Sequence, residues 1–457
     1  MASSRTHTGP LFSELESRGL IKQTTAPELA QALEKGPMTL YCGFDPTSDS
    51  LHVGSLLPLL TLKRFQDAGH RVIAVVGGAT GMIGDPSGKS QERNLLDEAA
   101  IAKNLAGITR VIERFLHLSG PNPALIVNNG DWFKGMGFIQ FLRDVGKHFT
   151  VNHMLAKESV RSRLEDREHG ISYTEFSYML LQAYDFYVLN KTQGCQLQVG
   201  GSDQWGNITA GVELIRRMRA FENGAEATGN RAVATGNRAE ASQESPETFG
   251  LTWPLLTKAD GTKFGKTESG ALWLTSDRTS AYQFHQYFLQ TADADVISLL
   301  KQLTFVPLDE IVELEAQTRS APEKRAAQHR LADELTRIVH GEAELQRALN
   351  ASKALFSEDV RSLDASTLLS VFAGAPKFTT SKSRLAEGLP LIDALAESGL
   401  CASKGAARKE IQGGGISINN ERVSDIQAKL ELAHLIADRF IVLRRGKKTH
   451  QLVEFHD

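Results

Sequence analysis

Apolar runs and polar breaks alternate along the first 220 residues in a way that predicts strands alternating with helices. Residues 38–44, 71–77 and 124–128 are short apolar runs of the length and composition of buried strands. Residues 56–68 predict a helix, with Pro58 in the first turn, where proline is tolerated. This alternation predicts a parallel, doubly wound sheet of the Rossmann type, whose ligands bind beyond the carboxyl ends of the strands.

The pattern changes toward the C-terminus. Residues 1–278 form the predicted Rossmann-type α/β domain, and residues 279–374 carry the helical period of an all-α domain. Residues 375–388 predict a linker. Residues 389–457 predict a small α+β module, with helices at 389–398 and 403–411 and strands at 416–419 and 440–443.

Residues 221–246 break the alternation. The hexapeptide Ala-Thr-Gly-Asn-Arg-Ala occurs at 227–232 and again at 234–239, in a small, polar stretch without periodicity. Such composition predicts a mobile surface insertion rather than a functional site.

Length, charge and cysteine content narrow the class of protein. The 457 residues exceed one ordinary domain, and the net charge is −3. Residues 376–457 carry 13 Lys and Arg against 10 Asp and Glu, so we expect any nucleic-acid contact near the C-terminus. The N-terminus is polar and no apolar run is long enough to span a bilayer, which predicts a protein without membrane attachment. The three cysteines, Cys42, Cys195 and Cys401, are scattered, which predicts a reduced, cytoplasmic protein without disulfides or zinc.

The first candidate site is residues 41–55, where a buried strand runs into a turn rich in Gly and Asp and then into a helix. A helix N-terminus aimed beyond a strand end suits a phosphate group. His52 is a donor for a phosphate oxygen, and Gly54 leaves room for a flat base against the backbone. An ordinary capped turn gives the same pattern, so these residues alone leave both interpretations open.

The second candidate site is residues 258–270, which hold Lys258, Lys263 and Lys266 among glycines. A flexible, positive loop of this kind suits closure over a polyphosphate and stabilisation of a leaving group. A solvated lysine loop is the alternative.

A third group of polar residues shares one helix face. Tyr178, Gln182 and Asp185 stand at i, i+4 and i+7, a spacing that suits a pocket for a polar aromatic ligand. A half-exposed amphipathic helix is the alternative. Residues 200–206, after a strand predicted at 195–199, form another ligand loop at a strand end.

Residues 84–90 look like a phosphate-binding Walker loop, but three residues separate the glycines where that motif has four. We therefore interpret Asp85 and Lys89 as pocket residues.

Taken together, the first two sites resemble the HIGH and KMSKS signatures of class I aminoacyl-tRNA synthetases, as His52-Val53-Gly54-Ser55 and Lys263-Phe264-Gly265-Lys266-Thr267. The stretches Tyr-Cys-Gly-Phe-Asp-Pro-Thr, Gly-Asp-Pro-Ser-Gly-Lys, Phe-Ser-Tyr-Met-Leu-Leu-Gln-Ala-Tyr-Asp and Gly-Gly-Ser-Asp-Gln-Trp-Gly-Asn-Ile resemble the bacterial tyrosyl-tRNA synthetase family. The likeness covers nearly the whole chain, except residues 221–246 and the first few.

The resemblance implies a class I catalytic domain, a helical anticodon-stem-binding domain and a C-terminal RNA-binding module. It implies activation of L-tyrosine with ATP, followed by transfer of the tyrosyl group to the 3′-terminal adenosine of tRNA(Tyr). It also implies Mg²⁺ bound with the phosphates, without a dedicated protein metal site, and a homodimer.

The resemblance further implies a role for each matching residue, with Tyr41 and Asp185 on the tyrosine hydroxyl. The tyrosine-binding group is Tyr41, Asp85, Tyr178, Gln182, Asp185, Gln198 and Gln204. The ATP-binding group is Gly43, Asp45, His52, Gly54, Ser55, Gly201, Asp203 and Lys266. The residues that assist the reaction are Thr47, His52, Lys89, Arg93, Lys263, Lys266 and Thr267. The tRNA-binding group is Lys404, Arg408, Lys409, Arg444, Arg445, Lys447 and Lys448.

Two departures from the family pattern and three rival functions stand beside this interpretation. Ser55 replaces the histidine of many relatives, and Phe264 and Gly265 make the second signature a variant. The rivals are a tryptophanyl-tRNA synthetase, an RNA-binding or splicing factor on a former synthetase scaffold, and a nucleotidyltransferase that does not use tRNA. The phenol-binding groups favour tyrosine, the retained His52 and lysines favour an enzyme, and the helical and C-terminal regions favour tRNA.

Overall fold

A computed structural model describes residues 10–87, 96–157, 160–161, 164, 170–222, 247–262, 264–267, 270–354, 358–372, 377–446 and 449–457. The chain divides into two compact units. Unit 1 comprises Met1–Thr275 and Ala294–Ala316, and unit 2 comprises Ser276–Asp293 and Gln317–Asp457. The chain therefore passes between the units three times.

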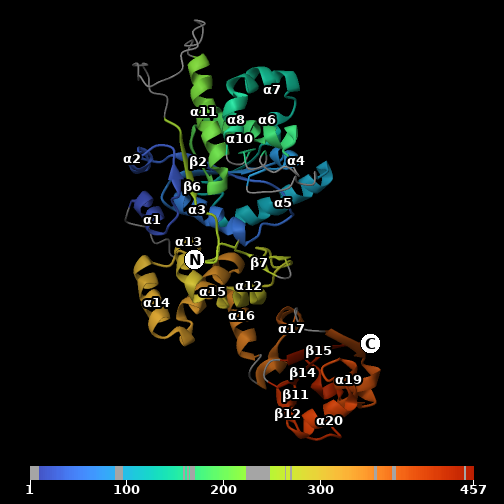
Figure 1. Cartoon of the computed structure of the whole chain (residues 1–457). Helices are drawn as coiled ribbons and strands as arrows, with labels where there is room; N and C mark the ends of the chain where they lie inside the picture. The colour runs from blue at the N-terminus through green and yellow to red at the C-terminus, as the bar shows by residue number, and fades with distance from the viewer. Residues whose placement is uncertain are drawn as a thin grey trace. The chain divides into compact units, whose positions relative to one another are not determined.

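Unit 1 is built on a six-stranded sheet with the strand order β1-β6-β5-β2-β3-β4 (Figure 1). The strands are β1 (Gln23–Thr24), β2 (Thr39–Phe44), β3 (Arg71–Val76), β4 (Leu125–Asn128), β5 (Cys195–Gly201) and β6 (Phe249–Trp253). All neighbours pair in parallel except β1, which lies antiparallel to β6 at the edge. The predicted Rossmann-type parallel sheet is confirmed, with its three predicted N-terminal strands in place.

Helices cover both faces of this sheet, as the doubly wound pattern requires (Figure 1). In this view α10 (Tyr173–Gln193) and α11 (Trp205–Glu222) lie above it, and α3 (Leu56–Asp67) and α5 (Glu98–Phe115) lie below it. One apolar cluster joins Tyr41 and Ile73 of the strands to Phe186 of α10.

Shorter elements complete unit 1. Within the described residues, its shorter helices include α1 (Leu11–Ser17), α2 (Leu29–Lys35), α4 (Thr80–Ile83), α6 (Gly130–Phe133), α7 (Phe138–Asp144) and α8 (Val151–Leu155). Its 3₁₀ turns are η1 (Val53–Ser55), η2 (Gly146–His148) and η3 (Ser202–Gln204), and a small hairpin pairs β7 (Lys266–Thr267) with β8 (Gly270–Ala271).

Two further helices, α13 (Asp293–Leu303) and most of α14 (Leu308–Ser320), belong to unit 1. Their sequences have the helical period of the all-α domain predicted at 279–374, so the sequence pattern alone does not separate them from that domain. Two buried arginines explain this placement. Arg18 donates to the carbonyl oxygens of Thr304 and Val306, at 3.3 and 3.1 Å, and Arg64 also donates to Thr304. These backbone acceptors follow the end of α13, so the pair ties that turn to α1 and α3.

Unit 2 begins with the expected helices. They are α12 (Ala281–Leu289), α15 (Ala326–His340), α16 (Glu342–Ala354) and α17 (Ala365–Val371), with 3₁₀ turns η4 (Pro322–Lys324) and η5 (Glu358–Ser362). α12 starts with a capping box between Ser280 and Gln283, and it packs with α15 and α16.

A five-stranded sheet, β12-β11-β14-β15-β9, forms the C-terminal part of unit 2. Its strands are β9 (Lys377–Ser381), β11 (Ile416–Ile418), β12 (Glu421–Val423), β14 (Phe440–Arg445) and β15 (Thr449–His456). Nearby lie α18 (Ser383–Ala386), α19 (Leu391–Glu397), α20 (Lys404–Gln412), η6 (Leu432–His434) and the strand pair β10 (Leu389–Pro390) and β13 (Lys429–Leu430). The small α+β module is confirmed.

Both faces of this sheet are apolar. Ile441 and Leu443 of β14 pack in the cluster that holds α19 and α20, whereas Phe440 and Val442 pack in the cluster that holds residues of α16 and α17. Successive strand residues face opposite sides, so one strand serves both clusters.

The linker predicted at 375–388 is wrong over the residues that the structure describes. Residues 377–381 form β9, which pairs in parallel with β15, and Leu385 of α18 is buried in the core. β9 is an edge strand of mostly polar residues, which explains why its sequence resembles a linker.

Three remaining observations concern the whole chain. Cys42, Cys195 and Cys401 are free and buried. Among the helices that the structure describes, none has the length and apolar character needed to cross a bilayer. Of the insertion predicted at 221–246, Phe221 and Glu222 end α11, and residues 223–246 lie outside the described part.

Candidate active site

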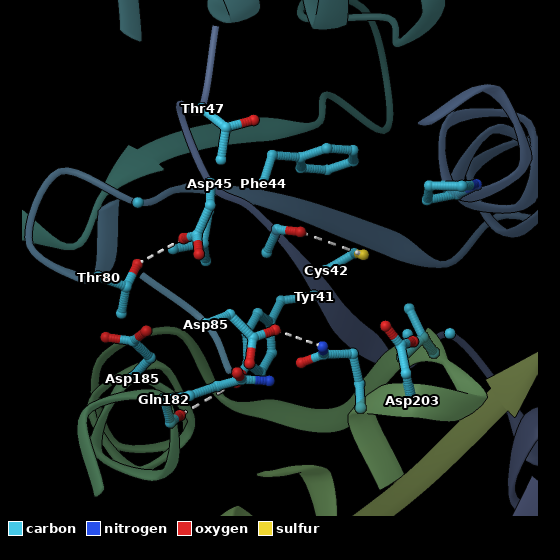
Figure 2. A pocket seen from close by; sticks show the side chains of 18 of the residues that line it. Tyr41, Cys42, Phe44, Asp45, Thr47, Thr80, Asp85, Gln182, Asp185 and Asp203 are labelled. Carbon is cyan, nitrogen blue, oxygen red and sulfur yellow. Dashed lines mark hydrogen bonds between the residues drawn. The ribbon is translucent and has the colours of Figure 1, made fainter. Parts of the chain in front are cut away.

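A cavity of about 650 Å³ opens in unit 1 where β2 and β5 end (Figure 2). This is the edge at which a parallel sheet holds its ligands. Thirteen of the predicted site residues line it: Tyr41, Gly43, Asp45, Thr47, His52, Gly54, Asp85, Tyr178, Gln182, Asp185, Gly201, Asp203 and Gln204.

Asp185 of α10 lies at the buried end, with 3% of its surface exposed. Asn129 Nδ2 donates to one carboxylate oxygen at 3.1 Å, and Trp132 Nε1 donates to the other at 2.8 Å. Burial raises the pKa of Asp185 to about 8, although both hydrogen bonds act to lower it. This carboxyl group is therefore held in a fixed position and is unusually ready to carry a proton.

Tyr41 faces the same end of the cavity from β2 (Figure 2). Burial, and then the nearby Asp185, raises the pKa of its phenol well above the ordinary value. Its hydroxyl donates weakly to the carbonyl oxygen of Gln182, at 3.5 Å. A neutral phenol beside a carboxyl group suits a ligand that carries a hydroxyl of its own.

Asp45 is held in the middle of the cavity by two hydroxyl groups. Tyr178 donates to one carboxylate oxygen at 2.7 Å, and Thr80 donates to the other at 2.8 Å. Burial, followed by the charge of Asp45, raises the pKa of Tyr178 well above its ordinary value. Both neutral hydroxyls remain donors, which fixes the orientation of the carboxylate.

A chain of amide side chains lines the wall between Asp85 and α10. Gln204 Nε2 donates to Asp85 at 2.6 Å, and Asn207 Nδ2 contacts the Gln204 and Gln182 side-chain oxygens at 3.2 and 3.1 Å. Asp85 also accepts a bond from the backbone of Ser87 at 2.9 Å. The orientation of each amide thus depends on its neighbours.

The opposite, open end of the cavity is formed by His52 and Gly54. His52 caps η1, and its Nδ1 accepts a bond from the Gly54 backbone at 3.0 Å. A Cβ atom added at Gly54 would lie 2.7 Å from the His52 ring, so the ring needs glycine there. The bond to Nδ1 leaves Nε2 as the ring nitrogen that carries the proton when His52 is neutral.

The two signature segments, some 200 residues apart in sequence, lie together. Val53 N donates to Leu272 O at 2.8 Å, and Leu272 N donates to Gly265 O at 3.2 Å. Gly265 has a φ of +87°, and a Cβ atom there would lie 2.1 Å from Val53 Cγ1. A positive φ and a close neighbour both require glycine at this variant position of the second signature.

Two predicted site residues do not line the cavity: Gln198 is buried in β5, and Ser55 ends η1. The backbone of Lys266 and Thr267 forms β7. The predicted residues that fall outside the described part are Lys89, Arg93, Lys263, Lys447 and Lys448.

The predicted tRNA-binding residues lie in unit 2. Lys404, Arg408 and Lys409 are exposed on α20, and Lys404 pairs with Asp393 at 2.9 Å. Arg444 and Arg445 are half-buried at the end of β14, where Arg444 donates to Ser417 at 3.3 Å. Arg408 and Lys409 are thus more accessible to a polyanion than the two β14 arginines.

Sequence reasoning missed four residues that orient the predicted groups: Thr80, Asn129, Trp132 and Asn207. Asn129 comes directly after β4, and Trp132 and Thr80 each stand four residues beyond the end of a strand, β4 and β3 respectively. The strand-end rule used for the other loops therefore points to all three. Asn207 follows the ligand loop at 200–206 by one residue.

The cavity is rich in carboxyl groups, with Asp45, Asp85, Asp185 and Asp203 in its lining. This charge suits a cationic group such as an ammonium ion. In the residues that the structure describes, no cluster of His, Cys, Asp and Glu is arranged to hold a metal ion.

Comparison with known proteins decides which family carries this cavity. A family model described as tRNA synthetases class I (W and Y) matches residues 33–357, and a Tyrosine--tRNA ligase SYY-like C-terminal domain matches residues 368–453. The tyrosine--tRNA ligase of Bacillus caldotenax is 51% identical over 97% of this chain and 99% of its own length. The chain belongs to the tyrosine--tRNA ligases.

More distant tyrosine--tRNA ligases support the same placement. The enzyme of Rhodopirellula baltica is 48% identical over 98% of this chain and 97% of its own length. A truncated mitochondrial tyrosyl-tRNA synthetase of Aspergillus nidulans is 32% identical, has a TM-score of 0.64, and covers 76% of this chain and 94% of its own. Full-length similarity to tyrosine--tRNA ligases removes the tryptophanyl alternative.

Proposed function

We propose that the cavity holds L-tyrosine and ATP together and joins them into tyrosyl-adenylate, with release of pyrophosphate. One observation carries this proposal: the buried Asp185 carboxyl group, beside the Tyr41 phenol, lies in the same cavity as the His52 and Gly54 turn. The first pair suits a phenol hydroxyl, and the second suits a nucleotide. The chain then transfers the tyrosyl group to the 3′-terminal adenosine of tRNA(Tyr).

Amino-acid activation depends on positioning the two substrates, because no general base is needed to ionise the tyrosine carboxylate. The tyrosine carboxylate is already ionised at neutral pH, so it is ready to attack the α-phosphate of ATP. The cost lies in bringing two anions together and stabilising the charge that develops in the transition state. Asp85, with Tyr178 and Gln182, is placed to hold the tyrosine ammonium group and so to orient the carboxylate.

The nucleotide lies at the open end in this proposal. Asp45, Gly54, Gly201 and Asp203 contact adenosine, while Thr47 and His52 face the triphosphate. Mg²⁺ arrives on the phosphates as part of the ATP substrate. Lys266 and Thr267, with Lys263, stabilise pyrophosphate as it leaves, and Lys89 and Arg93 assist from the other side. Gly265 approaches the Val53 side chain closely, and the backbone of Leu272 bonds to both Val53 and Gly265. These contacts support a loop that acts beside His52.

The C-terminal module supplies contacts to tRNA in this proposal. Deleting it would expose the apolar cluster that Phe440 and Val442 share with Phe372, so point variants are the cleaner test. We expect the double variant Arg408→Ala/Lys409→Ala to raise the KM for tRNA(Tyr) about tenfold, because exposed cations contact phosphates. Tyrosine-dependent pyrophosphate exchange stays unchanged. Unaltered charging kinetics at physiological salt would contradict this role.

A cytoplasmic homodimer completes the proposal. The helices α7 and α8 expose Phe138, Ile139 and Val151, with 62%, 73% and 59% of their surfaces exposed, and apolar groups of this kind mark protein interfaces. A second copy of the chain is the proposed occupant of this face. Sedimentation equilibrium that finds only monomer at micromolar concentration would contradict it.

The decisive experiment is exchange of labelled pyrophosphate into ATP with each of the twenty amino acids, in the absence of tRNA. Exchange with tyrosine alone supports both the adenylate chemistry and the Asp185 pocket. Exchange with tryptophan, or no exchange from a well-folded preparation, would overturn the proposal.

A further inference from the structure

We infer that α5, which does not line the cavity, positions the triphosphate-facing turn through Asn104 and Gly107. This turn, residues 45–49, carries Thr47 between β2 and the His52 segment. The inference rests on the proposed function, because that function places Thr47 against the triphosphate. Asn104 and Gly107 do not line the cavity, so both are positioning residues.

Gly107 lies where α5 meets the backbone of the turn. A Cβ atom added there would lie 1.9 Å from the carbonyl oxygen of Asp49 and 2.7 Å from its carbonyl carbon. Backbone atoms do not swing aside as a flexible side chain does, so the turn or the helix would have to move by about 1 Å or more. A glycine inside a helix is otherwise unfavourable, which makes this close approach a sufficient reason for it.

Asn104 makes the second link, one helical turn earlier. Its Nδ2 donates to the carbonyl oxygen of Pro46 at 2.9 Å. Asn104 stands between Ile101 and Ile108 on the stripe that α5 turns toward the sheet, where a polar residue is out of place unless it has a partner. The ion pair of Lys103 with Asp49, 3.5 Å apart, has an exposed lysine and contributes little.

On the side opposite α5, Gly77 and Gly81 approach the turn about as closely as Gly107 does. A Cβ atom at Gly77 would lie 2.3 Å from the Asp45 carboxylate, and one at Gly81 would lie 2.6 Å from the Pro46 ring. Within the turn, Thr47 N donates to Asp45 O at 2.9 Å. The turn is therefore held between residues 77–81 on one side and α5 on the other, so a shift of α5 presses the turn against Gly77 and Gly81.

The expected consequence is selective for the nucleotide. The Asp185 carboxyl group at the buried end is fixed by Asn129 and Trp132, and neither contact passes through α5. Tyr178 touches the turn at Asp45, but Thr80 of α4 holds the other oxygen of that carboxylate at 2.8 Å. A displaced turn misplaces Thr47 relative to the phosphates, and a misplacement of about 1 Å costs a reaction about 10²-fold in rate. The inference predicts that loss in adenylate formation, with tyrosine affinity preserved.

The test compares Gly107→Ala and Asn104→Ala with the wild-type enzyme in pre-steady-state adenylate formation. Gly107→Ala should lower the rate about 10²-fold, and Asn104→Ala about tenfold. The dissociation constant for tyrosine, measured by equilibrium binding, should stay within about twofold. Asn104→Gln, which keeps an amide donor, should recover part of the loss.

Gly405→Ala is the matched control, because Gly405 lies in α20 and a Cβ atom there would approach nothing closer than 3.8 Å. It should leave adenylate formation unchanged. If the α5 variants lower the thermal midpoint but leave the ATP-dependent rate unchanged, or lower tyrosine affinity as much as the rate, the inference is wrong. A wild-type enzyme that lacks tyrosine-dependent exchange would instead overturn the proposed function.

Discussion

The buried end of the cavity, around Asp185, and its open end, around His52, satisfy their polar groups in different ways. At the buried end, Asp185, Tyr178 and Asp85 each have a side-chain hydrogen bond of 2.8 Å or less. The partners are Trp132 of α6, Asp45 directly after β2, and Gln204 of η3. At the open end, His52 is exposed and bonds to the backbone two residues away. The buried end is thus complete before any ligand binds.

This difference suggests that the buried end selects the amino acid and that the open end promotes adenylate formation. A preformed hydrogen-bonding pocket discriminates between amino acids, because a ligand without the matching hydroxyl leaves buried polar groups unpaired. An open end that a loop completes can admit ATP, release pyrophosphate and contribute mainly in the transition state. Substitutions at the two ends should therefore change different kinetic constants.

The largest effect that we expect comes from Lys266→Ala. Removing a cation that stabilises the leaving group should lower the rate of adenylate formation about 10²- to 10³-fold and leave tyrosine affinity within about twofold. Pre-steady-state kinetics with tyrosine titration measures both quantities. Lys258→Ala, in the same loop but outside the signature, is the matched control with less than a threefold effect. Equal losses in the rate of adenylate formation and in tyrosine affinity would mean that the two ends of the cavity do not act separately.

Trp132→Phe tests the buried end. It removes the indole N–H that donates to Asp185 at 2.8 Å and retains an aromatic ring. We expect kcat/KM for tyrosine to fall about tenfold, while the KM for ATP stays unchanged, because a hydrogen bond that holds the Asp185 carboxyl group in place is lost. Poor activity toward phenylalanine, measured in parallel, should hardly change. A loss shared equally by tyrosine and phenylalanine would mean that Trp132 acts only through packing.

The raised pKa of Asp185 predicts how stability depends on pH. Between its ordinary value of 3.8 and about 8, the folded protein keeps a proton that the unfolded chain releases, so the free energy of unfolding falls as pH rises. The slope from this group is at most about 1.4 kcal/mol per pH unit. Urea unfolding at pH 5 and pH 7.5 should show a smaller decline for Asp185→Asn than for the wild type. Parallel declines would mean that Asp185 is ionised throughout this range.

Ser55→His should have the smallest effect. Ser55 ends η1 and does not line the cavity, so restoring the histidine of many relatives should change the KM for ATP by no more than about twofold. Steady-state pyrophosphate exchange at varied ATP concentration measures this. A gain of tenfold or more would show that this position reaches the nucleotide in the bound state.

The sheet and most of the cavity lining could be predicted because they follow from short-range patterns. Strands such as 71–76 are marked by β-branched residues, and the strand-end rule then places Asp45 and Asp203 at one edge. Helical spacing likewise brings Tyr178, Gln182 and Asp185 to one face.

Other features depend on contacts that local sequence does not encode. β9 is polar and becomes a strand only because β15, about 70 residues later, offers its edge. The role of Thr80 depends on its hydroxyl meeting Asp45, 35 residues away in the chain. α13 joins unit 1 because Arg18 and Arg64 donate to the carbonyl oxygen of Thr304, directly after that helix. The family likeness assigns Gln198 to the tyrosine, whereas this residue is buried in β5 and does not line the cavity.

The threefold passage of the chain between units 1 and 2 has a consequence for inheritance. A single break in the gene at any of the three passages yields two pieces, and at least one unit is then divided between them or joined to part of the other. Recombination that replaced all of unit 2 in one event would also have to preserve residues 294–316 from the original parent. Unit 2 therefore cannot be exchanged as a whole in one event, whereas its C-terminal part, which carries the proposed tRNA-binding residues, follows the last passage as one continuous segment.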